Sequence, residues 1–152
     1  MTRLSSASSN DDILHVLHET ADAAYKVLSS NTDWGLSGKR PTQYSVDLRA
    51  DAAALEVLHG AGCAVLSEES GRTGDWHDDS IIVVMDPLDG STNASRRVPW
   101  YATALAAVDG TGHRKAPRNQ PRAAPRALQR RHGDPPNTAW VAFPKAPSRY
   151  WN

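Results

Sequence analysis

Apolar residues recur at helical spacing near the start of the chain. From Asn10 to about Ser30 they lie three or four positions apart: Leu14, Leu17, Ala21, Ala24 and Leu28. Asn10 and the two acids after it are typical of a helix start, where side chains accept hydrogen bonds from free amides and negative charge favours the helix dipole. The pattern predicts an amphipathic helix over about 10–30.

A second helical pattern covers about 48–59, where Ala52, Leu55 and Leu58 share one face. Glycine follows directly, and glycine is the usual residue just past a helix end. The segment 31–41 between the two patterns contains glycines and a proline, which predicts a loop. The first sixty residues are therefore expected to form two helices.

Three short apolar runs follow, and each predicts a strand. They cover 64–67, 81–85 and 101–108, and the second contains four consecutive aliphatic residues. Such a run is typical of a strand that is buried on both faces. The segment 71–80 is polar and predicts turns. Two helices followed by strands that end in acidic residues predict a layered α/β architecture.

The distribution of charge divides the chain near residue 110. Residues 1–110 contain 16 of the 17 acids and 8 of the 17 Lys/Arg residues, a net charge of −8. Residues 111–152 contain nine basic residues, a single acid and seven of the ten prolines. A segment with so few aliphatic residues cannot bury enough apolar surface to fold. We predict one domain over 1–110 and a disordered Arg/Pro/Ala-rich tail over 111–152.

Three explanations of this tail remain open. Its charge would support salt-dependent contacts with nucleic acid, but no aromatic residue interrupts the basic ones before Trp140, so nucleic acid is not an expected partner. A natural tail without a role is the second explanation. We favour the third, a shift of reading frame near codon 110, because GC-rich genes read out of frame produce runs of Arg, Pro, Ala and Gly.

Targeting signals and thiol chemistry are not expected. The polar amino terminus and the absence of a long apolar run predict a cytoplasmic protein without a membrane partner. Cys63 is the one cysteine and lies among small apolar residues. This excludes a disulfide within the chain and a thiolate metal site, and it predicts a buried thiol.

The residues around the second predicted strand combine groups that bind metal and phosphate. Asp86 and Asp89 follow the four aliphatic residues directly, with Pro87 between them and Gly-Ser-Thr after them. Carboxylates at the end of a buried strand are costly to bury without a partner. Glu68 and Glu69 end the strand before it. Hard oxygen ligands beside free backbone amides predict a site for divalent cations and a phosphate.

This part of the chain resembles the inositol monophosphatase family, whose signature reads Asp-Pro-hydrophobic-Asp-Gly-Thr/Ser-x-Asn. The matching residues are Asp86, Pro87, Leu88, Asp89, Gly90, Ser91 and Asn93. The Glu-Glu pair and an upstream helix with an aspartate occur in the family's order, and the resemblance extends to about Gly110. It implies the amino-terminal part of the αβαβα sandwich shared with fructose-1,6-bisphosphatase, and hydrolysis of a phosphate monoester by metal-activated water without a phosphoenzyme.

The resemblance implies particular metal ligands. Glu68 and Asp86 would hold the activating Mg²⁺ together with the backbone carbonyl of Leu88, and Asp86 and Asp89 would hold a second ion. Glu69 is expected just outside the ligand set. Family members use two or three Mg²⁺ ions, are inhibited by Li⁺, act on small phosphorylated substrates such as inositol phosphate, and are often homodimers.

The resemblance also implies a phosphate cradle and a group that handles water. The backbone amides of Gly90, Ser91 and Thr92 would bind the phosphate, and the Ser91 hydroxyl would orient the attacking water. In the family, the partner of this hydroxyl is an aspartate in the helix upstream of the two glutamates. Asp51 fits that position better than Asp47. The family often has a lysine in the loop before this helix, where Lys39 lies here, but a loop lysine is usually only solvated.

Other classes of function remain in view. Complete relatives carry a Trp-Asp-x-Ala-Ala segment whose aspartate serves the second metal, and the chain has no such segment. We therefore expect little or no turnover, and the alternative is an inactive metal-binding fragment or an interaction module. Haloacid-dehalogenase phosphatases begin their site with Asp-x-Asp-Gly-Thr. The extra residue between Asp86 and Asp89 would misplace the second acid for that chemistry.

Overall fold

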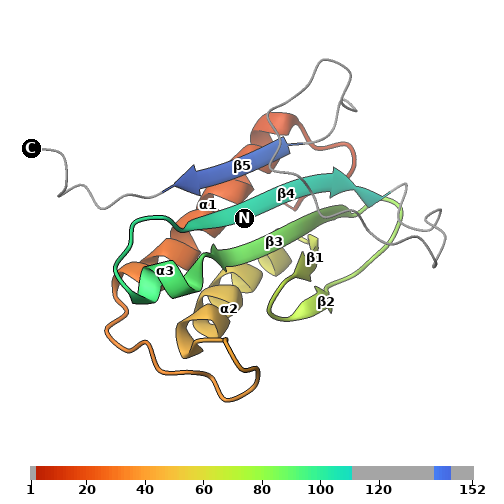
Figure 1. Cartoon of the computed structure of the whole chain (residues 1–152). Helices are drawn as coiled ribbons and strands as arrows, with labels where there is room; N and C mark the ends of the chain where they lie inside the picture. The colour runs from red at the N-terminus through yellow and green to blue at the C-terminus, as the bar shows by residue number, and fades with distance from the viewer. Residues whose placement is uncertain (1–2, 111–138, 145–152) are drawn as a thin grey trace, which may run out of the picture.

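Two long helices pack against one face of a mixed sheet (Figure 1). The computed structural model describes residues 3–110 and 139–144. The helices are α1 (Asn10–Ser29), α2 (Ser45–Gly60) and the short α3 (Ser91–Ser95), and the strands are β1 (Ala64–Ser67), β2 (Gly71–Thr73), β3 (Ile81–Asp89), β4 (Ala102–Asp109) and β5 (Ala139–Pro144). The five strands lie in the order β2-β1-β3-β4-β5. The predicted α/β class is confirmed.

The residue that caps helix α1 lies one position earlier than predicted. Ser9 is extended, and its hydroxyl accepts a hydrogen bond from the Asp12 backbone N–H at 3.2 Å. Asn10, the expected cap, is already helical. The two acids in the first turn and Lys26 in the last turn complement the helix dipole.

Helix α2 begins at Ser45, three residues before the predicted start at about 48. The reason is local, because the Tyr44 backbone N–H donates to the Asp47 carboxylate at 2.8 Å. An acid at the third helical position satisfies an amide that would otherwise lack an acceptor. The earlier start places Asp47 in the first turn of α2.

The core lies between the two helices and the sheet. Its buried members come from α1, α2, β1, β3 and β4, and include Leu17, Leu58, Val65, Val83 and Leu105. Cys63 is buried in the same cluster as a free thiol, as predicted. The core therefore attaches both helices to the central strands.

Strand β3 extends beyond the predicted end at residue 85. It pairs in parallel with β1, with Ser67 opposite Met85, and antiparallel with β4 as far as Asp89. The register of the second pairing shifts between Asp86 and Asp89. Pro87 falls within this irregular stretch, where a residue without an N–H is tolerated.

Two strands were not predicted. Strand β2 lies in the segment 71–80 and pairs antiparallel with β1, and β5 pairs antiparallel with β4. Strand β5 comes from the segment predicted as a tail. Residues 111–138 and 145–152 of that segment lie outside the described residues, so its disorder and its origin in a frame shift stay predictions.

Replacing Leu58 by Ala should destabilise the fold, because this side chain is fully buried in the core. Leucine-to-alanine changes at such positions cost about 2–5 kcal/mol. Urea unfolding followed by circular dichroism measures the change. Leu36→Ala is the control, because Leu36 is 59% exposed, and a surface change should stay within about 0.5 kcal/mol. Equal effects of the two substitutions would contradict the described core.

Candidate active site

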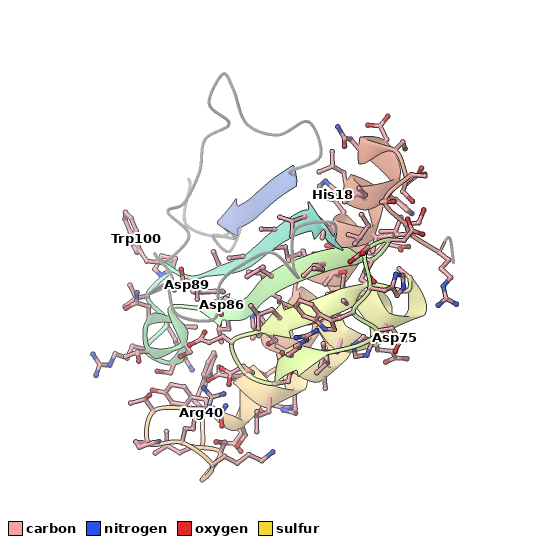
Figure 2. The ribbon with its side chains drawn as sticks, turned by 90° about the vertical axis from the view of Figure 1, so that its right-hand side faces the viewer. His18, Arg40, Asp75, Asp86, Asp89 and Trp100 are labelled. Carbon is pink, nitrogen blue, oxygen red and sulfur yellow. The ribbon has the colours of Figure 1, made fainter. Side chains whose placement is uncertain are left out.

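The carboxyl ends of β1 and β3 meet at one edge of the sheet, because the two strands run in parallel. The backbone N–H of Glu68, the first residue after β1, donates to the Met85 carbonyl at 2.9 Å. Asp86 is the residue that follows Met85. The strand pairing therefore brings Glu68 and Asp86 together from distant parts of the chain. Figure 2 shows Asp86 and Asp89 at this end of the sheet.

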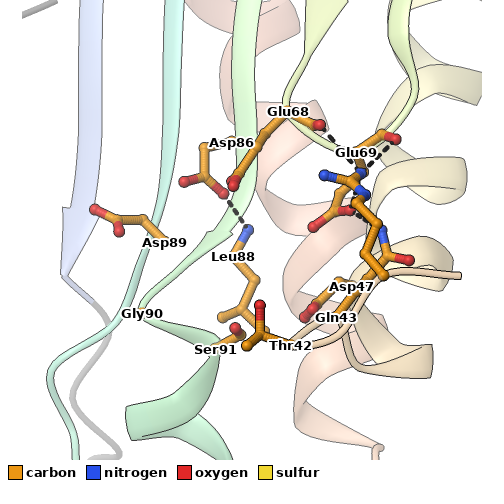
Figure 3. Close-up of a pocket in the computed structure, with 11 residues that line it drawn as sticks. Thr42, Gln43, Asp47, Glu68, Glu69, Asp86, Leu88, Asp89, Gly90 and Ser91 are labelled. Atoms are coloured by element: carbon orange, nitrogen blue, oxygen red, sulfur yellow. Dashed lines mark hydrogen bonds and ion pairs between the residues drawn. The ribbon is translucent and has the colours of Figure 1, made fainter. Parts of the chain in front are cut away.

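A pocket of about 170 Å³ opens at this edge (Figure 3). Its lining comes from the loop before α2, the start of α2, the turn after β1, and the junction of β3 with α3: Arg40, Thr42, Gln43, Asp47, Glu68, Glu69, Asp86, Leu88, Asp89, Gly90 and Ser91. Most of the predicted site residues are thus brought together. Asp51, Thr92 and Lys39 do not line the pocket.

Asp86 lies in a strongly negative environment. Burial together with the neighbouring Glu68 and Asp89 raises the pKa of its carboxyl to about 7, and a hydrogen bond from the Leu88 N–H at 3.1 Å opposes the rise. Figure 3 draws Asp86 between Glu68 and Asp89. Near neutral pH, a proton on Asp86 relieves part of this repulsion. A cation would relieve it as well.

Asp47 contributes a second buried carboxyl to the pocket. One oxygen accepts from the Tyr44 N–H, and the other, Oδ1, has no hydrogen-bond partner in the described part of the chain. Burial together with Glu69 and Glu68 raises the pKa of Asp47 to about 6, and the Tyr44 hydrogen bond and Arg40 oppose the rise. An unpaired buried oxygen favours a donor, such as a water molecule, on the pocket side.

The structure does not bring Asp51, the predicted partner of Ser91, into the pocket. Asp51 is buried one turn further along α2, where the Ser67 hydroxyl donates to its carboxylate. Asp47, which ranked second on sequence, lines the pocket together with Ser91. Because α2 begins at Ser45, Asp47 lies in its first turn beside the pocket, whereas Asp51 lies one turn further along the helix.

Sequence reasoning missed the inward-facing residues of the loop before α2. The Arg40 guanidinium pairs with the Glu69 carboxylate at 2.8 Å and donates to the Glu69 and Glu68 carbonyls at 2.8 and 3.3 Å. Gln43 donates to the same carboxylate. Two adjacent basic residues in a loop do not reveal which one turns inward, and here it is Arg40 rather than Lys39.

The donor chemistry of the pocket fits a hard divalent cation. Glu68, Asp86 and Asp89 supply carboxylate oxygens, the ligand type that Mg²⁺ prefers, and their mutual repulsion raises the pKa of Asp86. Within residues 3–110 and 139–144, no three acidic, histidine or cysteine side chains converge closely enough to hold one ion as they stand. Binding of a cation would therefore require these side chains to move closer together.

A sharp turn connects the acidic strand end to α3. Gly90 has a φ of 88°, and a Cβ atom there would lie 2.8 Å from the Trp100 carbonyl oxygen. Ser91 begins α3, and the first amides of a helix have no acceptor within it. The turn thus presents Ser91 to the pocket, whereas Thr92 is exposed outside it.

Several of the proteins that this chain resembles in sequence and fold are named as phosphatases. A fructose-1,6-bisphosphatase/inositol-1-monophosphatase from Archaeoglobus fulgidus is 33% identical over 100 residues, which cover 62% of this chain and 38% of that protein. Inositol monophosphatase from Anabaena (TM-score 0.51; 66% of this chain and 36% of that chain covered) and the extragenic suppressor protein suhB from Bartonella henselae (0.56; 66% and 41%) are each 26% identical.

The amino-terminal two thirds of the chain are similar in sequence and in fold to proteins named inositol monophosphatase and fructose-1,6-bisphosphatase/inositol-1-monophosphatase. The chain spans less than half the length of these relatives. No model of a known protein family matches it. None of the described helices is long and apolar enough to cross a membrane.

Asp86 should make the stability of the metal-free protein depend on pH. Its pKa is about 7 in the folded chain against an ordinary value of 3.8. Folding is therefore favoured at low pH, and this contribution is lost as pH rises from about 4 to about 7. Asp86→Asn should remove this loss and stabilise the metal-free protein at pH 8 by on the order of 1 kcal/mol, allowing for solvent screening.

Urea unfolding at pH 4.5, 6 and 8 in the presence of a chelator measures this effect. Asp22→Asn, at an exposed position on α1, is the matched control and should follow the parent protein. An unchanged pH profile in Asp86→Asn would show that Asp86 is not the group responsible.

Arg40 should hold down the pKa of Asp47, because its positive charge opposes the effect of the two glutamates. Replacing Arg40 by Gln should raise the pKa of Asp47 above about 6, and Lys39→Gln should leave it nearly unchanged. Carboxyl ¹³C chemical shifts followed across pH give both values. The same shift in both variants would mean that net charge, rather than the position of Arg40, sets the pKa.

Proposed function

We propose that this pocket binds Mg²⁺ and a phosphate monoester, as the amino-terminal part of a phosphatase active site. The observation that carries the proposal is that Glu68, Asp86 and Asp89 line one pocket together with Gly90 and Ser91. The relationship to proteins named inositol monophosphatase and fructose-1,6-bisphosphatase supports it.

The negative charge of the pocket argues for a metal-dependent activity. Three carboxylates at one sheet edge would repel the phosphate of a substrate, even with Arg40 neutralising Glu69 nearby. Divalent cations held by Glu68, Asp86 and Asp89 would reverse that charge and activate water as a nucleophile. Phosphate binding and cation binding are therefore expected to depend on each other.

Residues of the chain would position the substrate and the water around the cation. Amides at the start of α3, beginning with Ser91, would donate to phosphate oxygens, and Gly90 allows the backbone to turn toward them. The Ser91 hydroxyl would orient the water. The Asp47 carboxyl lines the same pocket and has a pKa of about 6, so at neutral pH it is largely ionised and can accept the water proton.

Turnover by these 152 residues is expected to be low. The printed sequence contains no Trp-Asp-x-Ala-Ala segment, so one acid that the family uses at the second metal is not supplied. Cation binding without efficient hydrolysis is accordingly the second candidate function. It is favoured by the acidic lining of the pocket, to which Glu68, Asp86 and Asp89 all contribute.

Isothermal titration with Mg²⁺ tests the cation site. We expect saturable binding to the purified chain, and Asp86→Asn and Glu68→Gln should each weaken it by about tenfold or more, because each removes a charged ligand. Glu56→Gln, an exposed change on α2, should have no effect. Absence of binding at millimolar Mg²⁺, or equal loss in all three variants, would contradict the proposed site.

Hydrolysis of inositol 1-phosphate in Mg²⁺, followed as released phosphate, tests the catalytic part of the proposal. A slow activity that Asp47→Asn and Ser91→Ala abolish would support it, and Li⁺ should inhibit that activity. Rates typical of efficient enzymes would contradict the expectation of low turnover. Binding of Mg²⁺ with no hydrolysis would favour the second candidate function.

A further inference from the structure

We propose that Asp51 is a positioning residue, which acts through Ser67 to fix the turn that presents Glu68 and Glu69 to the pocket. This inference rests on the proposed function for its consequence, namely cation affinity. Its structural basis is a chain of contacts from the buried side of α2 to the backbone of the acidic turn. None of the roles considered above uses this chain of contacts.

The first contact joins two buried polar side chains. Asp51 and Ser67 are each only 4% exposed, and the Ser67 hydroxyl donates to Asp51 Oδ1. A serine hydroxyl has one proton and two lone pairs. Because the Ser67 hydroxyl uses its proton to donate to the carboxylate, its lone pairs remain free to accept a hydrogen bond from another group.

The second contact reaches the turn itself. The Glu69 backbone N–H donates to the oriented Ser67 oxygen at 3.1 Å. The backbone N–H of the preceding residue, Glu68, is held by the Met85 carbonyl of β3 at 2.9 Å. The Glu68 amide therefore donates to the neighbouring strand, and the Glu69 amide donates to a hydroxyl that Asp51 orients. These two hydrogen bonds restrict rotation of the backbone between the two residues.

The turn is held from the opposite side as well. Arg40 donates to the carbonyls of Glu68 and Glu69, and it pairs with the Glu69 carboxylate. Since the Glu68 side chain is itself exposed, the backbone contacts, rather than packing, direct it toward Asp86. Asp51 thus holds the turn from the helix side and Arg40 from the loop side. Substitution of groups that orient metal ligands in this way commonly lowers metal affinity by about 10–100-fold.

Conservative substitutions separate positioning from simple stabilisation. Ser67→Ala removes the acceptor for the Glu69 N–H, Ser67→Thr retains a hydroxyl, and Asp51→Asn keeps the shape but loses the charge. Ser70→Ala is the control, because it removes an exposed serine from the same turn. Ser67→Ala should weaken Mg²⁺ binding by about tenfold, Asp51→Asn should weaken it less, and Ser67→Thr should restore it.

Amide hydrogen exchange supplies a readout that does not depend on the metal. In metal-free protein, exchange of the Glu69 N–H should be about tenfold faster in Ser67→Ala, as expected for one lost hydrogen bond. Asp51→Asn should accelerate the same exchange, and it should add nothing in the Ser67→Ala background, because the two residues act in series. Ser70→Ala should leave the rate unchanged.

The outcomes distinguish this inference from the proposed function. If the parent protein binds no Mg²⁺, the proposed function fails, while the Glu69 exchange rates still decide whether Asp51 positions the turn. If Asp51→Asn or Ser67→Ala lowers the melting temperature but leaves Glu69 exchange and Mg²⁺ affinity at the parent values, the role is purely structural and the inference is overturned. Independent, additive effects of the two substitutions would also overturn it.

Discussion

Parallel pairing of β1 with β3 is the constraint on which the site depends. With Ser67 opposite Met85, the next residue of each strand, Glu68 and Asp86, comes to the same point at the sheet edge. A slip of one residue in this register would move one of the two carboxylates to the other face of the sheet. The core holds the register, because Val65 and Val83, which are paired directly, are both fully buried.

Pairing of β1 with β3 concentrates negative charge at the ends of two strands whose backbones are held together. Three effects can balance this charge: the Arg40 guanidinium pairs with Glu69, Asp86 is partly protonated near neutral pH, and a bound cation would displace that proton. Proton and metal then compete for the same oxygens. The protein itself balances only part of the charge at this acidic edge, which is why we propose that a cation binds there.

The acidic strand could be predicted from its local sequence. Features that depend on contacts between distant parts of the chain could not. Four aliphatic residues followed by Asp-Pro-Leu-Asp-Gly specify a buried strand and a turn from neighbours alone. The choice between Asp47 and Asp51 depends on where α2 begins, and both occupy one face of that helix, so spacing does not separate them. Strand β2 has three residues with a glycine among them, and β5 lies in a segment whose composition does not favour folding.

The turn at Gly90 sets a limit on how this site can vary during evolution. At Gly90, any side chain would meet the carbonyl of Trp100 and require a left-handed φ that other residues rarely adopt. Substitutions at the side chains that line the pocket can therefore change what it recognises far more readily than the angle at which α3 leaves the sheet.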